Sequence, residues 1–155
     1  SDVYKRQVIG NHDSLLIKRS KLGNIPDEWM KPIDEIYGLD GIDFQEEYII
    51  DDVLLIHGEA AGGKSGWQDM CRKTGLSTVF GHYHSIGGIR YHQMRDQRTL
   101  FSMCVGCGID VKKYAFEYAK GSPDLPVIGA GIIYGPNRAY FEPFDWTDRK
   151  NTRRN

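Results

Sequence analysis

The amino-acid sequence predicts an α/β protein built as a two-sheet sandwich. Two observations favour this fold class. Short apolar runs of strand length alternate with amphipathic segments in the first half of the chain, and the second half is rich in strand-forming residues and glycine. The chain has 155 residues, which is enough for one domain with its own core and too short for two comfortable ones.

The first half is expected to alternate strands and helices. A helix is expected to begin within 14–20, and a second to cover 26–37, because Pro26 suits a first helical turn and Gly38 a helix end. A third, short helix at 67–74 is ended by Gly75. The expected strands are 8–9, 44–50, 53–56 and 78–80, of which 53–56 and 78–80 are continuously apolar and therefore expected to be buried.

The second half is expected to form a mostly antiparallel sheet, with 111–119 crossing over as helix or loop. Its expected strands are 86–93, 99–105, 127–134 and 139–144. The polar and basic stretch 148–155 has no apolar anchor and is expected to be a disordered tail. The predicted domain therefore covers residues 1–147.

Composition excludes several classes of protein. A formal charge of −1 provides no bulk attraction to nucleic acid or to an anionic membrane surface. No apolar run approaches the length of a bilayer span, and the N-terminus lacks the pattern of a signal peptide. An odd number of cysteines, three, does not make a disulfide framework. We therefore expect a cytoplasmic protein that does not associate with membranes.

Four of the five histidines follow predicted strands, each close to a glycine. His12 comes after 8–9, His57 after 53–56, and His82 and His84 after 78–80. In α/β sheets, ligands bind in the crevice outside the carboxyl ends of the strands. These side chains are therefore expected to converge on one site.

The donor types at these strand ends favour a transition metal. Imidazoles together with the amide oxygen of Asn11, with no cysteine nearby, suit Mn, Fe, Zn or Ni better than a thiolate site does. The His82-x-His84 spacing places two imidazoles on one short loop, from which they can reach neighbouring ions.

The ordered blocks Gly10-Asn11-His12-Asp13, His57-Gly58 and Gly81-His82-Tyr83-His84 resemble the last three of the five motif blocks of the calcineurin-like metallophosphoesterases, whose phage and bacterial members also have a similar C-terminal sheet. The resemblance implies an α/β/β/α sandwich. It also implies a hydrolase that uses two divalent transition-metal ions and a bridging hydroxide to cleave a phosphoester, in a small molecule or at a nucleic-acid end.

The resemblance also implies a role for each matching residue. Asn11, His57 and His82 would bind one metal ion, and His84 would bind the other. His12 would not bind metal, and would instead protonate the leaving oxygen beside the phosphate. Asp13 would accept a hydrogen bond from His12 and fix its tautomer.

The sequence departs from the family pattern at its start. The family also has an Asp-x-His block and a Gly-Asp block upstream, the second of which supplies the carboxylate that bridges both metals. Only nine residues precede Gly10, and Asp2 is the sole acidic one. We therefore expect a natural chain that extends upstream and supplies the first strand–helix units of the fold, with residues 1–7 foreign to it. The chain as given is expected to bind at most one metal ion, weakly, and to be poorly active.

Three alternative interpretations stay open. The segment 58–65 matches the P-loop pattern G-x-x-x-x-G-K-[ST], in which Lys64 would reach a nucleotide phosphate; otherwise it is a flexible loop at the rim of the active site. Cys104-x-x-Cys107 matches a redox or zinc pair, although two partly buried thiols explain it better. The protein could also be a non-catalytic binding module on the same fold. His92, outside the motif blocks, is expected to face solvent.

Overall fold

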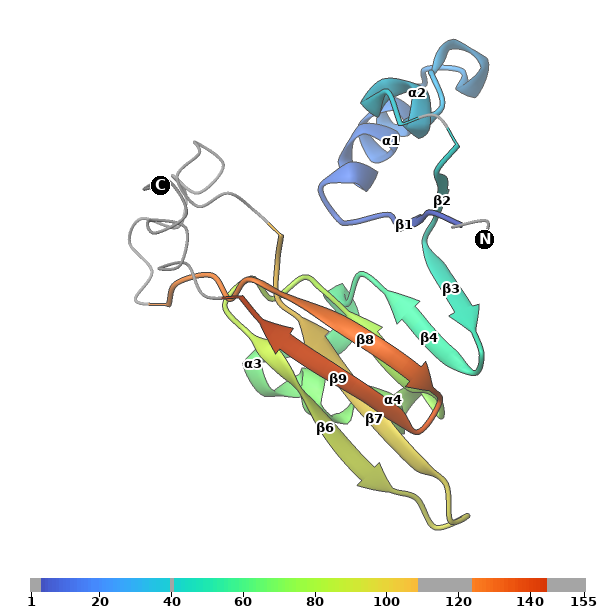
Figure 1. Cartoon of the computed structure of the whole chain (residues 1–155). Coiled ribbons are helices and arrows are strands. Elements are labelled where there is room, and N and C mark those ends of the chain that lie inside the picture. Colours follow the sequence, from blue (N-terminus) through green and yellow to red (C-terminus); the bar gives the residue numbers. More distant parts are fainter. Residues whose placement is uncertain (1–3, 40, 109–123, 145–155) are drawn as a thin grey trace.

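The computed structural model describes residues 4–39, 41–108 and 124–144. It confirms a mixed α/β protein with several sheets (Figure 1). The expected crossover at 111–119 and the expected tail at 148–155 lie outside the described residues. No helix in the described part of the chain has both the length and the apolar character needed to cross a membrane.

The centre of the fold is a five-stranded sheet with the strand order β3-β4-β5-β7-β6. Its three inner strands run parallel to one another, whereas both edge strands pair antiparallel with their neighbours. The expected antiparallel pairing within the second half is therefore observed for β6 with β7, while β7 also pairs parallel with β5 of the first half. The strands are Glu47–Ile50 (β3), Val53–Ile56 (β4), Ser77–Phe80 (β5), Gly87–Gln93 (β6) and Thr99–Val105 (β7).

Short helical segments cover one face of this sheet (Figure 1). Trp67 and Met70 pack there against Phe80 of β5 and Cys104 of β7, and all four side chains are buried. The predicted helix at 67–74 is confirmed, with its first turn wound as a 3₁₀-helix and Gly75 in the left-handed conformation at its end. The segments are Glu59–Ala61 (η2), Gly63–Gly66 (α3), Trp67–Asp69 (η3) and Met70–Thr74 (α4).

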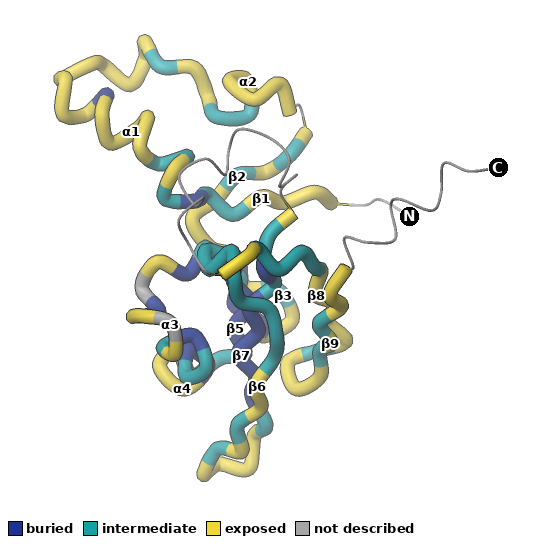
Figure 2. Tube along the Cα trace, turned by 90° about the vertical axis from the view of Figure 1, so that its left-hand side faces the viewer, coloured by how far each residue is buried: buried dark blue, intermediate teal, exposed yellow. Residues whose placement is uncertain are grey.

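A β-hairpin covers the opposite face of the sheet (Figures 1 and 2). It consists of β8 (Gly129–Gly135) and β9 (Arg138–Pro143). Phe141 of the hairpin packs against a core that includes Phe101 and Met103, both fully buried. A Cβ on Gly131 would lie 2.6 Å from Met103 Cε, so glycine allows the hairpin to approach the sheet closely. The inner strands are thus covered on both faces, which explains their apolar character.

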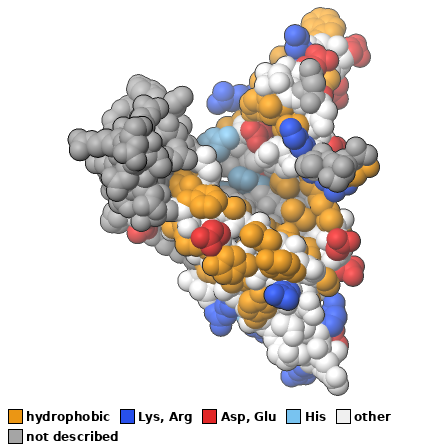
Figure 3. Space-filling view, in the orientation of Figure 1, with side chains coloured by type: hydrophobic (Ala, Val, Ile, Leu, Met, Phe, Trp, Pro, Cys, Tyr) orange, Lys and Arg blue, Asp and Glu red, His pale blue; other side chains and the backbone are white. Residues whose placement is uncertain are grey.

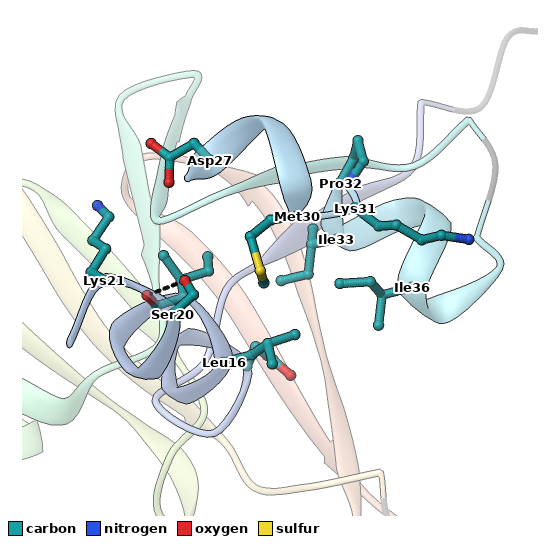
Figure 4. Close-up of a pocket in the computed structure, with 11 residues that line it drawn as sticks. Leu16, Ser20, Lys21, Asp27, Met30, Lys31, Pro32, Ile33 and Ile36 are labelled. Carbon is teal, nitrogen blue, oxygen red and sulfur yellow. Dashed lines mark hydrogen bonds between the residues drawn. The ribbon is translucent and has the colours of Figure 1, made fainter. Parts of the chain in front are cut away.

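The N-terminal segment forms a separate unit beside the sheet (Figure 1). β1 pairs parallel with β2 in a two-stranded sheet, and the helices between them enclose a groove of about 420 Å³. Leu16, Met30 and Ile33 point into this groove (Figure 4). The elements are Arg6–Val8 (β1), Asp13–Leu22 (α1), Asp27–Trp29 (η1), Ile33–Tyr37 (α2) and Asp43–Gln45 (β2).

The single helix expected at 26–37 is wrong. The structure has a 3₁₀ turn, an extended Met30 and then the short helix α2, with Pro32 at its N-cap. Pro32 has no N–H to donate and disfavours helical backbone at the residue before it, so the helix cannot pass through. Trp29, in the 3₁₀ turn, is 77% exposed.

Two further expectations are corrected. The strand expected at 44–50 is divided by a bend at Glu46, and its two halves pair with different partners, β1 and β4. His92 does not face solvent: its side chain is 13% exposed, and its Nε2 lies 2.8 Å from the carbonyl oxygen of Gln68. Successive side chains of β6 point to opposite faces of the sheet, and that of His92 points toward the helical layer. Because its neighbours in the sequence are polar, the sequence pattern does not indicate this burial.

Candidate metal centre

Three donor atoms converge beyond the carboxyl ends of β1, β4 and β5. Asn11 Oδ1 lies 2.8 Å from His57 Nε2, and His82 Nδ1 lies 3.1 Å from the same nitrogen. The two imidazole rings meet edge to face, with centroids 5.0 Å apart and planes at 78°. Histidine side chains line a hollow on this face of the molecule (Figure 3). The structure thus brings together three residues from separate motif blocks.

Unusual backbone positions allow this convergence. Gly10 is buried, and a Cβ there would lie 3.1 Å from Asp13 Oδ2 and 3.2 Å from His57 Cε1. Gly58 turns the chain after His57 with a φ of 104°. His82 has a φ of 62°, a left-handed conformation that is uncommon for a residue with a Cβ. Such strain persists only where surrounding structure enforces it, and it is concentrated at functional sites.

The hydrogen bonding within the trio is incomplete. His57 Nε2 carries at most one proton, so it can donate to only one of its two close neighbours. Suppose that the His57 Nε2–H donates to Asn11 Oδ1. If His82 Nδ1 is unprotonated, its lone pair then faces the same proton as Asn11 Oδ1 does; if it is protonated, its N–H faces the N–H of His57. Asn11 Oδ1 and two imidazole nitrogens therefore form a lone-pair-rich cluster that a cation would satisfy better than a single proton does.

Two of the three separations in the trio, 2.8 and 3.1 Å, are compatible with ligands that share one metal ion. With metal–ligand bonds of about 2.1 Å, adjacent ligands lie about 3.0 Å apart at octahedral angles and about 3.4 Å apart at tetrahedral angles. Among the described residues, no three His, Cys, Asp or Glu side chains are grouped to hold a metal. The trio contains only two residues of those types, because its third ligand is an amide.

Burial disfavours the charged forms of His57 and His84, and the neutral imidazole is the form that binds metal. Burial, with a further contribution from the charge of His82, lowers the pKa of His57 below its usual value; Glu59 and Asp13 oppose this shift. Burial also lowers the pKa of His84, and the charges of His82 and His12 lower it further. His84 and His12 therefore belong to the same electrostatic cluster as the trio.

The predicted contact between His12 and Asp13 is not observed. His12 is exposed at the N-cap of α1. The Asp13 carboxylate instead accepts hydrogen bonds from the Gly10 N–H at 2.8 Å and from the Tyr37 hydroxyl at 2.8 Å. Asp13 thereby fixes the loop that carries Asn11, because its side chain closes the turn that begins at Gly10. In this structure Asp13 stabilises the backbone of the loop and has no hydrogen bond with which to fix the tautomer of His12.

The segment that matches the P-loop pattern is wound into short helical turns. After Gly58 the chain forms η2 and then α3, a helix of only four residues. The Tyr83 hydroxyl donates to the carbonyl oxygen of Gly63 at 3.0 Å, which ties this segment to the loop that bears His82. No described contact specifically favours nucleotide binding, and that interpretation stays an untested alternative.

The cysteines are packed rather than paired. Cys71 and Cys104 are fully buried, and Cys107 is partly buried. Burial raises the pKa of the Cys104 thiol, which keeps it protonated and a poor nucleophile at neutral pH. The expectation of partly buried, unreactive thiols therefore agrees better with the structure than a redox pair does.

Sequence reasoning missed two tyrosines beside the site. Tyr37 holds Asp13 through its hydroxyl, and Tyr83 packs edge to face against His82 with ring centroids 5.1 Å apart. Tyr83 lies between His82 and His84 in the Gly-His-Tyr-His block, and this position could have indicated that it lies beside the site. Tyr37 is 24 residues from Asp13, and no local pattern connects the two.

Comparison of the chain with protein-family models, with curated proteins and with solved structures finds no match. The interpretation of the site therefore depends on its residues and their geometry.

Proposed function

We propose that the protein is a metal-dependent phosphoester hydrolase whose metal centre is the cluster of Asn11, His57 and His82. The observation that carries the proposal is the convergence of these three donors at separations of 2.8 and 3.1 Å. They come from three different strand ends, and the crevice outside the carboxyl ends of strands is where ligands bind in α/β sheets. The motif order, which resembles that of the calcineurin-like metallophosphoesterases, supports the phosphoester as the substrate.

The described residues provide ligands for one ion. Asn11, His57 and His82 would occupy three positions around it, and His84, whose charge interacts with those of His82 and His12, is the proposed ligand of a second ion. Asp13, the acidic residue nearest to Asn11 in the chain, is already held by Gly10 and Tyr37. Two dications a few ångströms apart repel strongly unless an anion bridges them. We therefore propose that this chain binds one divalent ion, and that activity requires a second.

The chain's own groups have separable roles in this proposal. A divalent cation at the trio supplies Lewis acidity toward a phosphoryl oxygen. His12 is exposed beside the cluster, where it can stabilise phosphate charge and donate a proton to the leaving oxygen. Asp13 and Tyr37 hold the turn that positions Asn11 and His12. The proposed substrate class is a phosphoester in a small molecule or at a nucleic-acid end.

The finer fold assignment is also a proposal. We propose that the β8–β9 hairpin belongs to the second sheet of an α/β/β/α sandwich. The hairpin packs on the five-stranded sheet opposite the helical layer, and this order of layers supports the proposal.

The first test is metal binding by the purified 155-residue chain. Calorimetric titration with Zn²⁺ is expected to yield about one ion per chain, with affinity lowered about tenfold or more in His57→Ala. His92→Ala is the matched control, since His92 lies in β6 and bonds to the helical layer instead of the trio. Equal affinity in wild type and His57→Ala would refute the proposed centre.

The second test is hydrolysis of aryl phosphate mono- and diesters with Mn²⁺, Ni²⁺, Zn²⁺ or Mg²⁺. We expect low turnover that His57→Ala abolishes and His92→Ala preserves. Robust turnover by this chain would contradict the proposal that it binds only one of the two ions. ATP binding that is lost in Lys64→Ala would favour the P-loop alternative.

A further inference from the structure

The loop from Gly81 to Ile86, which carries His82 and His84, lies against one buried thiol. Cys104 Sγ is 3.2 Å from the carbonyl oxygen of Ile86, 3.6 Å from that of Gly81 and 3.9 Å from that of Tyr83. These three carbonyl groups lie before, between and after the two histidines. Cys104 itself is fully buried near the end of β7, where β5 and the helical layer hold it in place.

Other contacts also hold this loop. The Val127 N–H donates to the His84 carbonyl oxygen at 2.8 Å, and Cys107 Sγ lies 3.9 Å from the same oxygen, at the limit of a sulfur contact. Within the loop, the Tyr83 N–H donates to the Gly81 carbonyl oxygen at 2.7 Å and the Ile86 N–H donates to that of Tyr83 at 3.2 Å. These bonds shape the turn and tie it to Val127, whereas Cys104 ties it directly to β7.

We propose that Cys104 is a positioning residue for the metal centre: its single S–H donates to the Ile86 carbonyl oxygen, the nearest at 3.2 Å, while the sulfur packs against the Gly81 and Tyr83 carbonyl groups, and together these contacts hold His82 and His84 in place. This inference rests on the proposed function, since it treats both histidines as ligands. His82 needs such support because its left-handed backbone, with a φ of 62°, is intrinsically unfavourable. Removing the donor takes away the thiol contact at the Ile86 carbonyl oxygen, whereas the Gly81 and Tyr83 carbonyl oxygens keep the backbone N–H groups of Tyr83 and Ile86 as donors.

Two substitutions separate the donor from the volume of the thiol. Cys104→Ser replaces the thiol with a hydroxyl, which is also a donor. Cys104→Ala removes the donor and leaves a small gap in the core. Cys71→Ala is the matched control, because Cys71 is also a fully buried cysteine but lies in α4, away from the loop. All three variants lose a sulfur atom from the core, so loss of packing affects them alike.

The first readout needs no metal. Hydrogen exchange followed by NMR is expected to show the amides of Tyr83 and Ile86 exchanging about three- to fivefold faster in Cys104→Ala than in wild type. Cys104→Ser and Cys71→Ala are expected to leave the exchange of these two amides, relative to the rest of the sheet, unchanged. Equal rates in Cys104→Ala and Cys71→Ala would overturn the inference, whether or not the chain binds metal.

The second readout is Zn²⁺ affinity. Cys104→Ala is expected to weaken binding about tenfold, and Cys104→Ser to restore it. If wild type binds Zn²⁺ and His57→Ala does not, but Cys104→Ala binds as wild type does, the positioning role is wrong and the metal centre stands. If His57→Ala binds as wild type does, the metal centre is wrong, and the exchange measurement alone decides the role of Cys104 in the loop.

Discussion

Replacing Gly58 with alanine tests how tightly the turn after His57 is packed. Gly58 has a φ of 104°, which disfavours any residue with a Cβ by about 1–2 kcal/mol. A Cβ there would also lie 2.9 Å from Phe80 Cδ2 and 3.0 Å from Phe80 Cβ. Phe80 is 1% exposed and has no room to withdraw, so overpacking adds about 1–3 kcal/mol. The expected loss is about 3 kcal/mol, or about 10 °C in melting temperature.

Gly75→Ala is the control for this substitution. Gly75 also has a positive φ, 73°, but a Cβ there meets nothing within 4 Å. Its expected loss is backbone strain alone, about 1 kcal/mol. Both variants are unfolded by heat and by urea under the same conditions. Equal losses of stability in the two variants would show that Gly58 does not pack against Phe80 as described.

Two further predictions concern acidity and the hairpin. Burial lowers the pKa of both His57 and His84, so at acidic pH these side chains bind protons more readily in the unfolded chain than in the folded one. The free energy of unfolding is therefore constant above the unfolded pKa of about 6.5 and falls as the pH drops below it. Urea midpoints at pH 7.5 and 5.5 measure this fall, and His57→Gln is expected to reduce it. In Ser77→Ala, the buried Phe101 N–H loses the hydroxyl to which it donates at 3.0 Å, and Pro136 loses its donor. The expected cost is about 1–3 kcal/mol, and a change below about 0.5 kcal/mol would contradict this bonding.

The strands were predictable where burial leaves a continuous apolar pattern. The segments 53–56, 78–80 and 99–105 correspond to β4, β5 and β7 within one residue. The apolar run at 53–56 reflects a strand covered on both faces, whereas Thr99 and Ser102 interrupt such a run in β7. Pairing was less predictable: whether β7 runs parallel to β5 depends on contacts that no local pattern encodes. The broken helix at 26–37 was readable in principle, since Pro32 stands inside it.

The candidate site was predictable in membership more than in detail. Strand-end placement predicted that His57 and His82 lie together, because β4 and β5 are parallel neighbours whose carboxyl ends lie at the same edge of the sheet. Asn11 follows β1 of the separate two-stranded sheet, so this rule does not explain its position. The partners of Asp13 were not predictable, since Tyr37 reaches it from another helix. Cys104 was judged from its spacing to Cys107, whereas its contacts are with the His82 loop across the sheet.

The position of a bound metal ion tests the central claim most directly. Crystals of the chain soaked in Zn²⁺, with diffraction recorded at the zinc absorption edge, reveal the ion by its anomalous signal. The account predicts a peak about 2.0–2.2 Å from Asn11 Oδ1, His57 Nε2 and His82 Nδ1, and its loss in His57→Ala crystals. A peak bound elsewhere, or no peak at the trio at saturating Zn²⁺, would contradict it.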